Sequence, residues 1–206
     1  MIWAARQLLV PCNYLRIREG DSLLQSKAVY DYVLPAVLTA VTAGVCVGLS
    51  IPFGMGHHPV LTKSLADLLA LLIAFYMAAL AAVSTFERAG IDGALKGGDA
   101  TLRVLNHETG AREDKKLSYR QFISYLFGYL SFISLILFIS LLFFSTAWPK
   151  ILNLGKDYKG WDHVVALLDP AFFIMFFFGT WQLLVTSLLG IYFLADRMQS
   201  LNDPQN

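Results

Sequence analysis

Charged residues are scarce in this sequence. Asp, Glu, Lys and Arg make up only 15% of its 206 residues, whereas about 25% is usual for soluble domains. Hydrophobic residues make up 56% and gather in four long runs, none of which has a charged residue near its centre. Proton relays, ion-coupled carriers and voltage sensors usually place ionisable groups there. The composition therefore indicates an integral membrane protein and argues against a secondary transporter.

Cysteines and catalytic motifs are also lacking. The two cysteines lie in a polar segment (Cys12) and in an apolar run (Cys46), so they predict no disulfide framework. The sequence has no HExxH metal motif, no phosphate-binding Gly-rich loop before a lysine, and no serine elbow. His57–His58 and Asp162–His163 do not have the spacing of a known metal site. We therefore expect no catalytic residue, no metal and no cofactor, and predict that the protein is not an enzyme.

The four apolar runs predict an all-α integral membrane protein with four transmembrane helices. Each run has about the 20 residues that cross the roughly 30 Å of bilayer hydrocarbon at 1.5 Å per residue. Pro52, Gly54, Gly56 and Pro59 are expected to end the first span, and Asp169-Pro170 is expected to interrupt the apolar run before the last span. The predicted spans are residues 32–51, 65–86, 121–147 and 171–194.

The basic residues predict the orientation, because cytoplasmic loops of membrane proteins carry an excess of Lys and Arg. Twelve of the 16 basic residues lie before the first span, between the second and third, or after the fourth. Both termini are therefore expected in the cytoplasm of a bacterium, with the protein in its inner (plasma) membrane. The predicted units are an amphipathic N-terminal segment (1–31), helical hairpins (32–86 and 121–195), a cytoplasmic insert (87–120) and a cytoplasmic tail (196–206).

Two cytoplasmic elements can be predicted in more detail. Residues 1–10 form a short amphipathic piece that either lies on the membrane or packs on the protein's own cytoplasmic face. In the insert, residues 101–105 alternate in polarity and 108–110 supply a turn, which predicts a small β-hairpin with 111–117. A two-stranded hairpin is marginal alone, so we expect it to lean on the N-terminal helix, a neighbouring subunit or another protein. Ser118 and Gln121 predict a capping box that starts the third helix.

Small residues recur at helical spacing in the first two spans. They predict that these spans pack against each other as an antiparallel pair, because helices in lipid associate through close contact of small side chains. Small residues lining a pore are the alternative. In the last span, Gln182 is expected to bond either to a serine of the third span or to its own copy in a neighbouring subunit. The predicted packing and oligomerisation residues are Gly44, Gly48, Ala70, Ala74, Ala78, Gly128, Ser131 and Gln182.

Basic residues of the insert are candidates for docking a partner. They lie beside the membrane, where anionic lipid attracts each Lys or Arg by about 1 kcal/mol, so lipid attraction is one explanation. The other is an acidic protein surface or a nucleotide ligand, and the neighbouring Glu113 and Asp114 favour protein over bare phosphate. No direct nucleic-acid binding is expected. The docking candidates are Arg103, Arg112, Lys115, Lys116 and Arg120.

Four spans, short outer loops and one small cytoplasmic insert resemble the architecture of small inner-membrane components of bacterial phage-defence operons. The membrane subunit of the Kiwa system is one such protein, and membrane effectors of retron or cyclic-oligonucleotide systems are similar in size. The resemblance implies homo-oligomerisation and work with a soluble cytoplasmic protein, but assigns no individual residue. We therefore expect an oligomeric membrane scaffold or sensor in antiviral defence, with a pore-forming or membrane-disrupting effector as the alternative.

Overall fold

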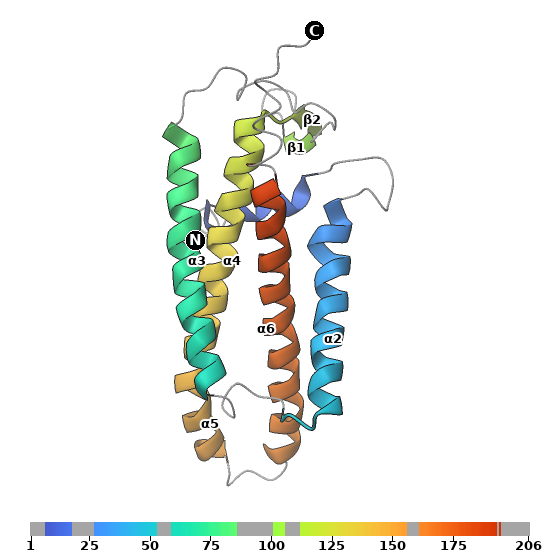
Figure 1. Cartoon of the computed structure of the whole chain (residues 1–206), viewed down its shortest axis with the longest axis vertical. Helices are drawn as coiled ribbons and strands as arrows, with labels where there is room; N and C mark the ends of the chain where they lie inside the picture. Colours follow the sequence, from blue (N-terminus) through green and yellow to red (C-terminus); the bar gives the residue numbers. More distant parts are fainter. Residues whose placement is uncertain are drawn as a thin grey trace.

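The structure is a bundle of long helices with a pair of short strands at one end (Figure 1). The computed structural model describes residues 7–17, 27–52, 59–85, 101–105, 112–155, 161–192 and 194. Four helices in this part of the chain are long and apolar enough to cross a membrane, as predicted. They span Val29–Gly48, Pro59–Thr85, Tyr119–Thr146 and His163–Tyr192.

The elements follow the predicted order along the chain. A 3₁₀ helix, η1 (Val10–Arg16), precedes a π-helical turn, η2 (Val29–Val33), which continues into α2 (Leu34–Gly48). Asp21-Ser22 followed by Gln25 also predicts a helix start before the first span, and these residues lie outside the described part of the chain. The remaining elements are α3 (Pro59–Thr85), β1 (Thr101–Leu105), β2 (Arg112–Lys116), α4 (Tyr119–Thr146), α5 (Trp148–Gly155) and α6 (Trp161–Tyr192).

Two predictions about helix ends have opposite outcomes. The capping box before α4 is confirmed, since Ser118 accepts a hydrogen bond from the Gln121 main chain and the Gln121 side chain accepts one from the Ser118 main chain. The predicted interruption at Asp169-Pro170 is wrong, because α6 continues through Pro170 from Trp161. Proline costs a transmembrane helix little where neighbouring groups satisfy the freed backbone, and Trp148 holds Asp169 at this turn through a 2.6 Å hydrogen bond.

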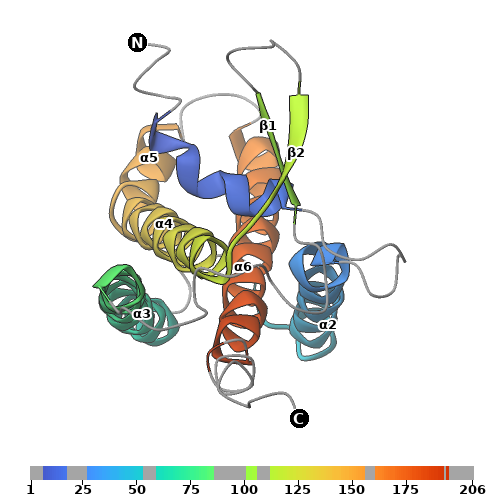
Figure 2. The same ribbon diagram turned by 90° about the horizontal axis from the view of Figure 1, so that it is seen from above.

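The first of the two predicted helical hairpins does not pack as a pair. Seen from above, α6 lies between α2 on one side and α4 with α3 on the other (Figure 2). α3 packs against α4, and α6 contacts both α4 and α2. The prediction that 32–86 forms a packed antiparallel hairpin is therefore wrong: its two helices are consecutive in sequence but lie on opposite sides of α6.

The buried face of α3 explains why this helix packs against α4. Its fully or nearly buried residues recur every seven positions: Thr62, Leu69, Tyr76 and Val83. A seven-residue repeat is the pattern of helices that cross at a shallow angle, and α4 offers it a long row of Phe, Leu and Tyr side chains. Large apolar side chains elsewhere on the bundle point outward, as lipid contact requires.

The two strands pair antiparallel, with Thr101 opposite Lys116 and Leu105 opposite Arg112. The residues that join them lie outside the described part of the chain. The pair lies at the end of the bundle where α2 and α4 begin and α6 ends (Figure 1). We call this the strand end.

Candidate functional site

A compact hydrophobic core joins the N-terminal segment, the strands and the start of α4 at the strand end. Tyr14 and Ile17 of the N-terminal segment are buried in the same cluster as Leu102 of β1 and Leu117, which follows β2. The cluster continues into α4 through Tyr119 and Phe122, and η1 contacts both α4 and β1. Of the supports expected for the strands, the structure therefore provides the N-terminal segment, together with the first turn of α4.

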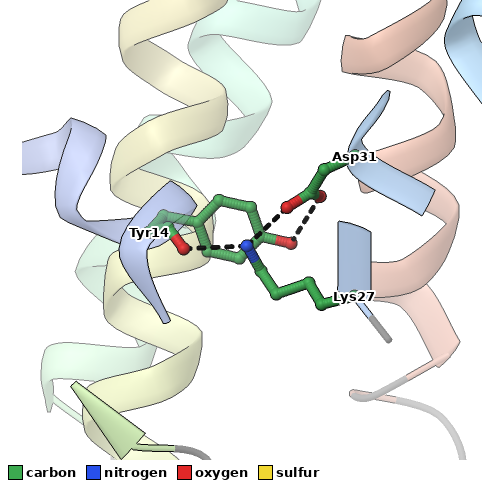
Figure 3. Close-up of polar contacts among 3 residues, drawn as sticks. All are labelled: Tyr14, Lys27 and Asp31. Carbon is green, nitrogen blue, oxygen red and sulfur yellow. Dashed lines mark hydrogen bonds and ion pairs between the residues drawn. The ribbon is translucent and has the colours of Figure 1, made fainter. Parts of the chain in front are cut away.

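A buried ion pair connects this core to the first transmembrane helix (Figure 3). The Lys27 ammonium lies 2.5 Å from an Asp31 carboxylate oxygen and donates a 2.8 Å hydrogen bond to the main-chain oxygen of Tyr14. It also lies 3.6 Å from the centroid of the Tyr14 ring, a cation–π contact. The Tyr14 hydroxyl donates a 3.4 Å hydrogen bond to the other Asp31 oxygen. All three side chains are buried. The cluster joins residues that are up to 17 positions apart in sequence.

Aromatic rings hold Tyr14 in place against α4. Its ring stacks on Tyr129 with centroids 5.1 Å apart and lies 6.4 Å from Phe122. The ring of Tyr14 therefore packs against two aromatic rings as well as the Lys27 ammonium, while its main-chain and hydroxyl oxygens bond to Lys27 and Asp31. This combination suits a tyrosine, whose apolar ring ends in a hydrogen-bonding group.

Asp31 lies in the π-helical turn rather than in a regular α-helix. In η2 the main-chain N–H of Leu34 bonds to the carbonyl of Val29, five residues earlier. Single π-helical turns carry one extra residue and occur frequently at functional sites. The turn therefore marks the cluster as the irregular point of the first transmembrane helix.

Hydrogen bonds between helices fix α6 to its neighbours deeper in the bundle. The Trp181 indole donates a 3.0 Å hydrogen bond to the Thr42 hydroxyl of α2, and Tyr76 of α3 shares a short hydrogen bond with Ser187. With lipid outside, such bonds and close packing replace the hydrophobic effect as the forces that select helix partners. α6 is thus tied to α2 on one side and to α3 on the other.

The predicted small-residue contacts between the first two spans do not form. Gly44 and Gly48 of α2 and Ala70, Ala74 and Ala78 of α3 are all exposed. A methyl group added at either glycine would meet nothing within 4 Å. In lipid an apolar helix face can lie equally well against another helix or against the bilayer. The spacing of small residues alone therefore could not identify the helix that packs there.

Close helix contact occurs instead at two glycines of α6 that were not predicted. A Cβ at Gly179 would lie 2.9 Å from Leu137, and one at Gly190 would lie 2.8 Å from Leu126. Both leucines belong to α4. The predicted Gly128 of α4 is half-buried and has no neighbour within 4 Å of an added Cβ.

The predicted polar residues of α4 and α6 lie within the bundle. Ser131 is half-buried and donates to the main-chain oxygen of Phe127, one turn earlier. Gln182 is 5% exposed, and among the described residues no hydrogen bond joins its amide to a serine of α4. One turn later, the hydroxyl of the fully buried Thr186 has no partner among the described residues. The intersubunit bond of Gln182 stays a prediction.

The predicted basic residues come together at the strand end. Arg103, Arg112 and Lys115 lie in the strands, though their side chains are not among those described. Lys116 is exposed, and Arg120 is half-buried in the first turn of α4. Sequence reasoning missed the Tyr14–Lys27–Asp31 cluster, although Lys27 and Asp31 are four residues apart at the edge of an apolar span, which is a recognisable signal.

No family model, curated protein or solved structure matched the chain. In the part of the chain that the structure describes, no three His, Cys, Asp or Glu side chains come together as a metal site would require. The strand end and the outward helix faces are therefore the features of the molecule that bear on its function.

Proposed function

We propose that the protein is an oligomeric inner-membrane scaffold or sensor whose strand end faces the cytoplasm and recruits or regulates a soluble protein. One observation carries the proposal: Tyr14, Ile17, Leu102 and Leu117 form a single buried core. This core joins the N-terminal segment and the strands to α4, so a partner bound to the strands acts directly on the transmembrane helices.

The charge at the strand end supports an acidic partner. Basic residues predominate there, and the exposed Lys116 lies directly before the buried Leu117 of the core. Charge complementarity chiefly raises the association rate and selects the partner. The excess of basic residues in the same segments supports the cytoplasmic orientation of both termini.

The exposed face of α2 supports assembly with further copies. Ala36, Ala40, Gly44 and Gly48 are exposed there, and each of the first three is followed by an exposed valine, Val37, Val41 and Val45. Small residues allow a second helix to approach closely, and valine has essentially one rotamer in a helix, so it loses little entropy on contact. The architectural resemblance to phage-defence membrane subunits extends the proposal to antiviral defence.

Partner recovery tests the proposal. We expect Lys115→Glu/Lys116→Glu to reduce the recovery of a cytoplasmic partner from native membranes by about tenfold, because a buried interface tolerates like charges poorly. Lys150→Glu is the matched control, since Lys150 is exposed in α5, at the opposite end of the bundle. Equal recovery with both variants would exclude this surface and leave lipid attraction as the role of the basic residues.

A pore-forming effector is the second candidate, and the polar residues of α4 and α6 are its support. In the single chain, Ser134, Thr180, Gln182 and Thr186 are buried between helices, which favours a packing role. Membrane potential separates the candidates: a scaffold leaves it intact when the protein is expressed with its partner and trigger, and a pore collapses it.

A further inference from the structure

We propose that Tyr14, Lys27 and Asp31 form a releasable latch that holds the N-terminal segment against the bundle and keeps the first transmembrane helix in its π-helical register. This inference goes beyond the proposed function and does not depend on the identity of any partner. It concerns how the strand end is coupled to the membrane.

The composition of the cluster favours a latch over a simple stabilising contact. A buried ion pair adds little net stability compared with apolar residues of the same size, because removing two charges from water is costly. Loss of one partner is far more damaging, since it leaves the other charge buried and unpaired. Such a pair therefore specifies one arrangement strongly and has one alternative, in which the segment leaves and both charges reach water.

The π-helical turn couples the Tyr14–Lys27–Asp31 cluster to the register of the first transmembrane helix. An α-helix advances about 100° and 1.5 Å per residue, so conversion of η2 to regular α-helix shifts everything before it by one residue relative to α2. The turn is restrained at two places. Lys27, before the turn, and Asp31, within it, bond to Tyr14, and α2, after the turn, accepts the hydrogen bond from Trp181 at Thr42. While both restraints last, the π-helical turn is retained.

Release of Tyr14 from Lys27 and Asp31 removes one of these two restraints on the turn. With α2 still bound to α6 through Trp181, the π-helical turn relaxes and the segment containing Lys27 rotates away from Tyr14. The buried core of Tyr14, Ile17 and Leu102 then loses its anchor on the first transmembrane helix. A binding event on the strands and the register of η2 are thus linked through η1, which contacts β1 and bonds to Lys27 and Asp31 through Tyr14.

Cys12 reports the state of the latch. It lies two residues before Tyr14 and is half-buried, and Cys46→Ser leaves it as the only thiol in the chain. In membranes or micelles, Lys27→Met and Asp31→Asn are expected to raise the rate of Cys12 labelling by a maleimide about tenfold or more. Lys150→Met, which removes an exposed lysine at the other end, is the control and should label at the parent rate.

Tyr14→Phe tests how much the latch depends on the hydroxyl of the tyrosine. The phenylalanine keeps the ring and the main-chain oxygen that accepts from Lys27, and it loses the 3.4 Å hydrogen bond from the hydroxyl to Asp31. Its labelling rate should change by about threefold or less. Labelling of Lys27→Met and Asp31→Asn at the parent rate would overturn the proposal.

Hydrogen exchange on the unmodified protein tests the coupling even where a variant fails to fold. Main-chain amides of η1 and η2 should open in one cooperative event, with equal protection, while the centres of α4 and α6 stay protected. Unequal protection of η1 and η2 would show that the two segments open separately, which contradicts a latch.

Discussion

Thr42 and Thr186 are both threonines of the helix bundle. Of the two, Thr42 has a hydrogen-bond partner on another helix among the described residues. Thr42 accepts a hydrogen bond from Trp181 and donates one to the main-chain oxygen of Leu38. The hydroxyl of Thr186 is fully buried and has no partner in the described part of the chain. The two residues therefore allow the value of an interhelical hydrogen bond to be measured against a matched background.

We expect Thr42→Val to lower the free energy of unfolding by about 0.6–2 kcal/mol, the range found for interhelical hydrogen bonds in membranes. Thr186→Val should be neutral or stabilising, because it removes a buried polar group that has no partner. Unfolding in mixed micelles, followed by circular dichroism, measures both. An equal loss in the two variants would contradict the assignment of the Trp181–Thr42 bond.

At the scale of elements, α4 and α6 approach closely at glycines of α6 rather than at the predicted Gly128 of α4. Gly190 has Leu126 within 2.8 Å of an added Cβ, whereas Gly128 has no neighbour within 4 Å. Each glycine lies inside a helix, so the same substitution at the two positions has a similar effect on helix propensity. Any difference between them reports interhelical space.

Gly190→Val should therefore unfold more easily than Gly128→Val, by about 1–3 kcal/mol, the usual cost of overpacking a well-filled core. The same unfolding assay measures this difference. If Gly128→Val is the more destabilised of the two, the contact of α6 with α4 is not as tight as described.

At the scale of the whole molecule, the outward face of α2 is the surface that we propose for contact with another copy. Gly44→Ile fills the proposed close contact with a branched side chain, and we expect it to weaken self-association by about tenfold or more. Because Gly44 is exposed in the single chain, the stability of the monomer should not fall correspondingly. Photobleaching of single labelled particles in native-lipid discs measures the copy number.

Ala74→Ile is the control for this change, since Ala74 is a small, exposed residue of α3. It should leave the copy number unchanged. Dissociation by Ala74→Ile together with intact assembly of Gly44→Ile would move the interface to α3.

Much of the architecture was readable from residues near one another in sequence. The charge-free runs predicted four membrane-spanning helices, because transfer to lipid depends on the composition of each segment by itself. Ser118 and Gln121 predicted the start of α4, because a capping box is a contact within one turn. The small size of a two-stranded pair predicted that the strands of the insert need support from another element. The N-terminal segment provides it through Tyr14 and Ile17.

Only the tertiary structure decided which helices are neighbours and which faces remain uncovered. Gly44 and Ala74 have the spacing of packed residues but are exposed, while Gly179 and Gly190 are the glycines that α4 contacts. The Tyr14–Lys27–Asp31 cluster likewise required two separate segments to meet. The physical reason is that lipid and a neighbouring helix are equally apolar, so hydrophobicity places a helix in the membrane without choosing its partner.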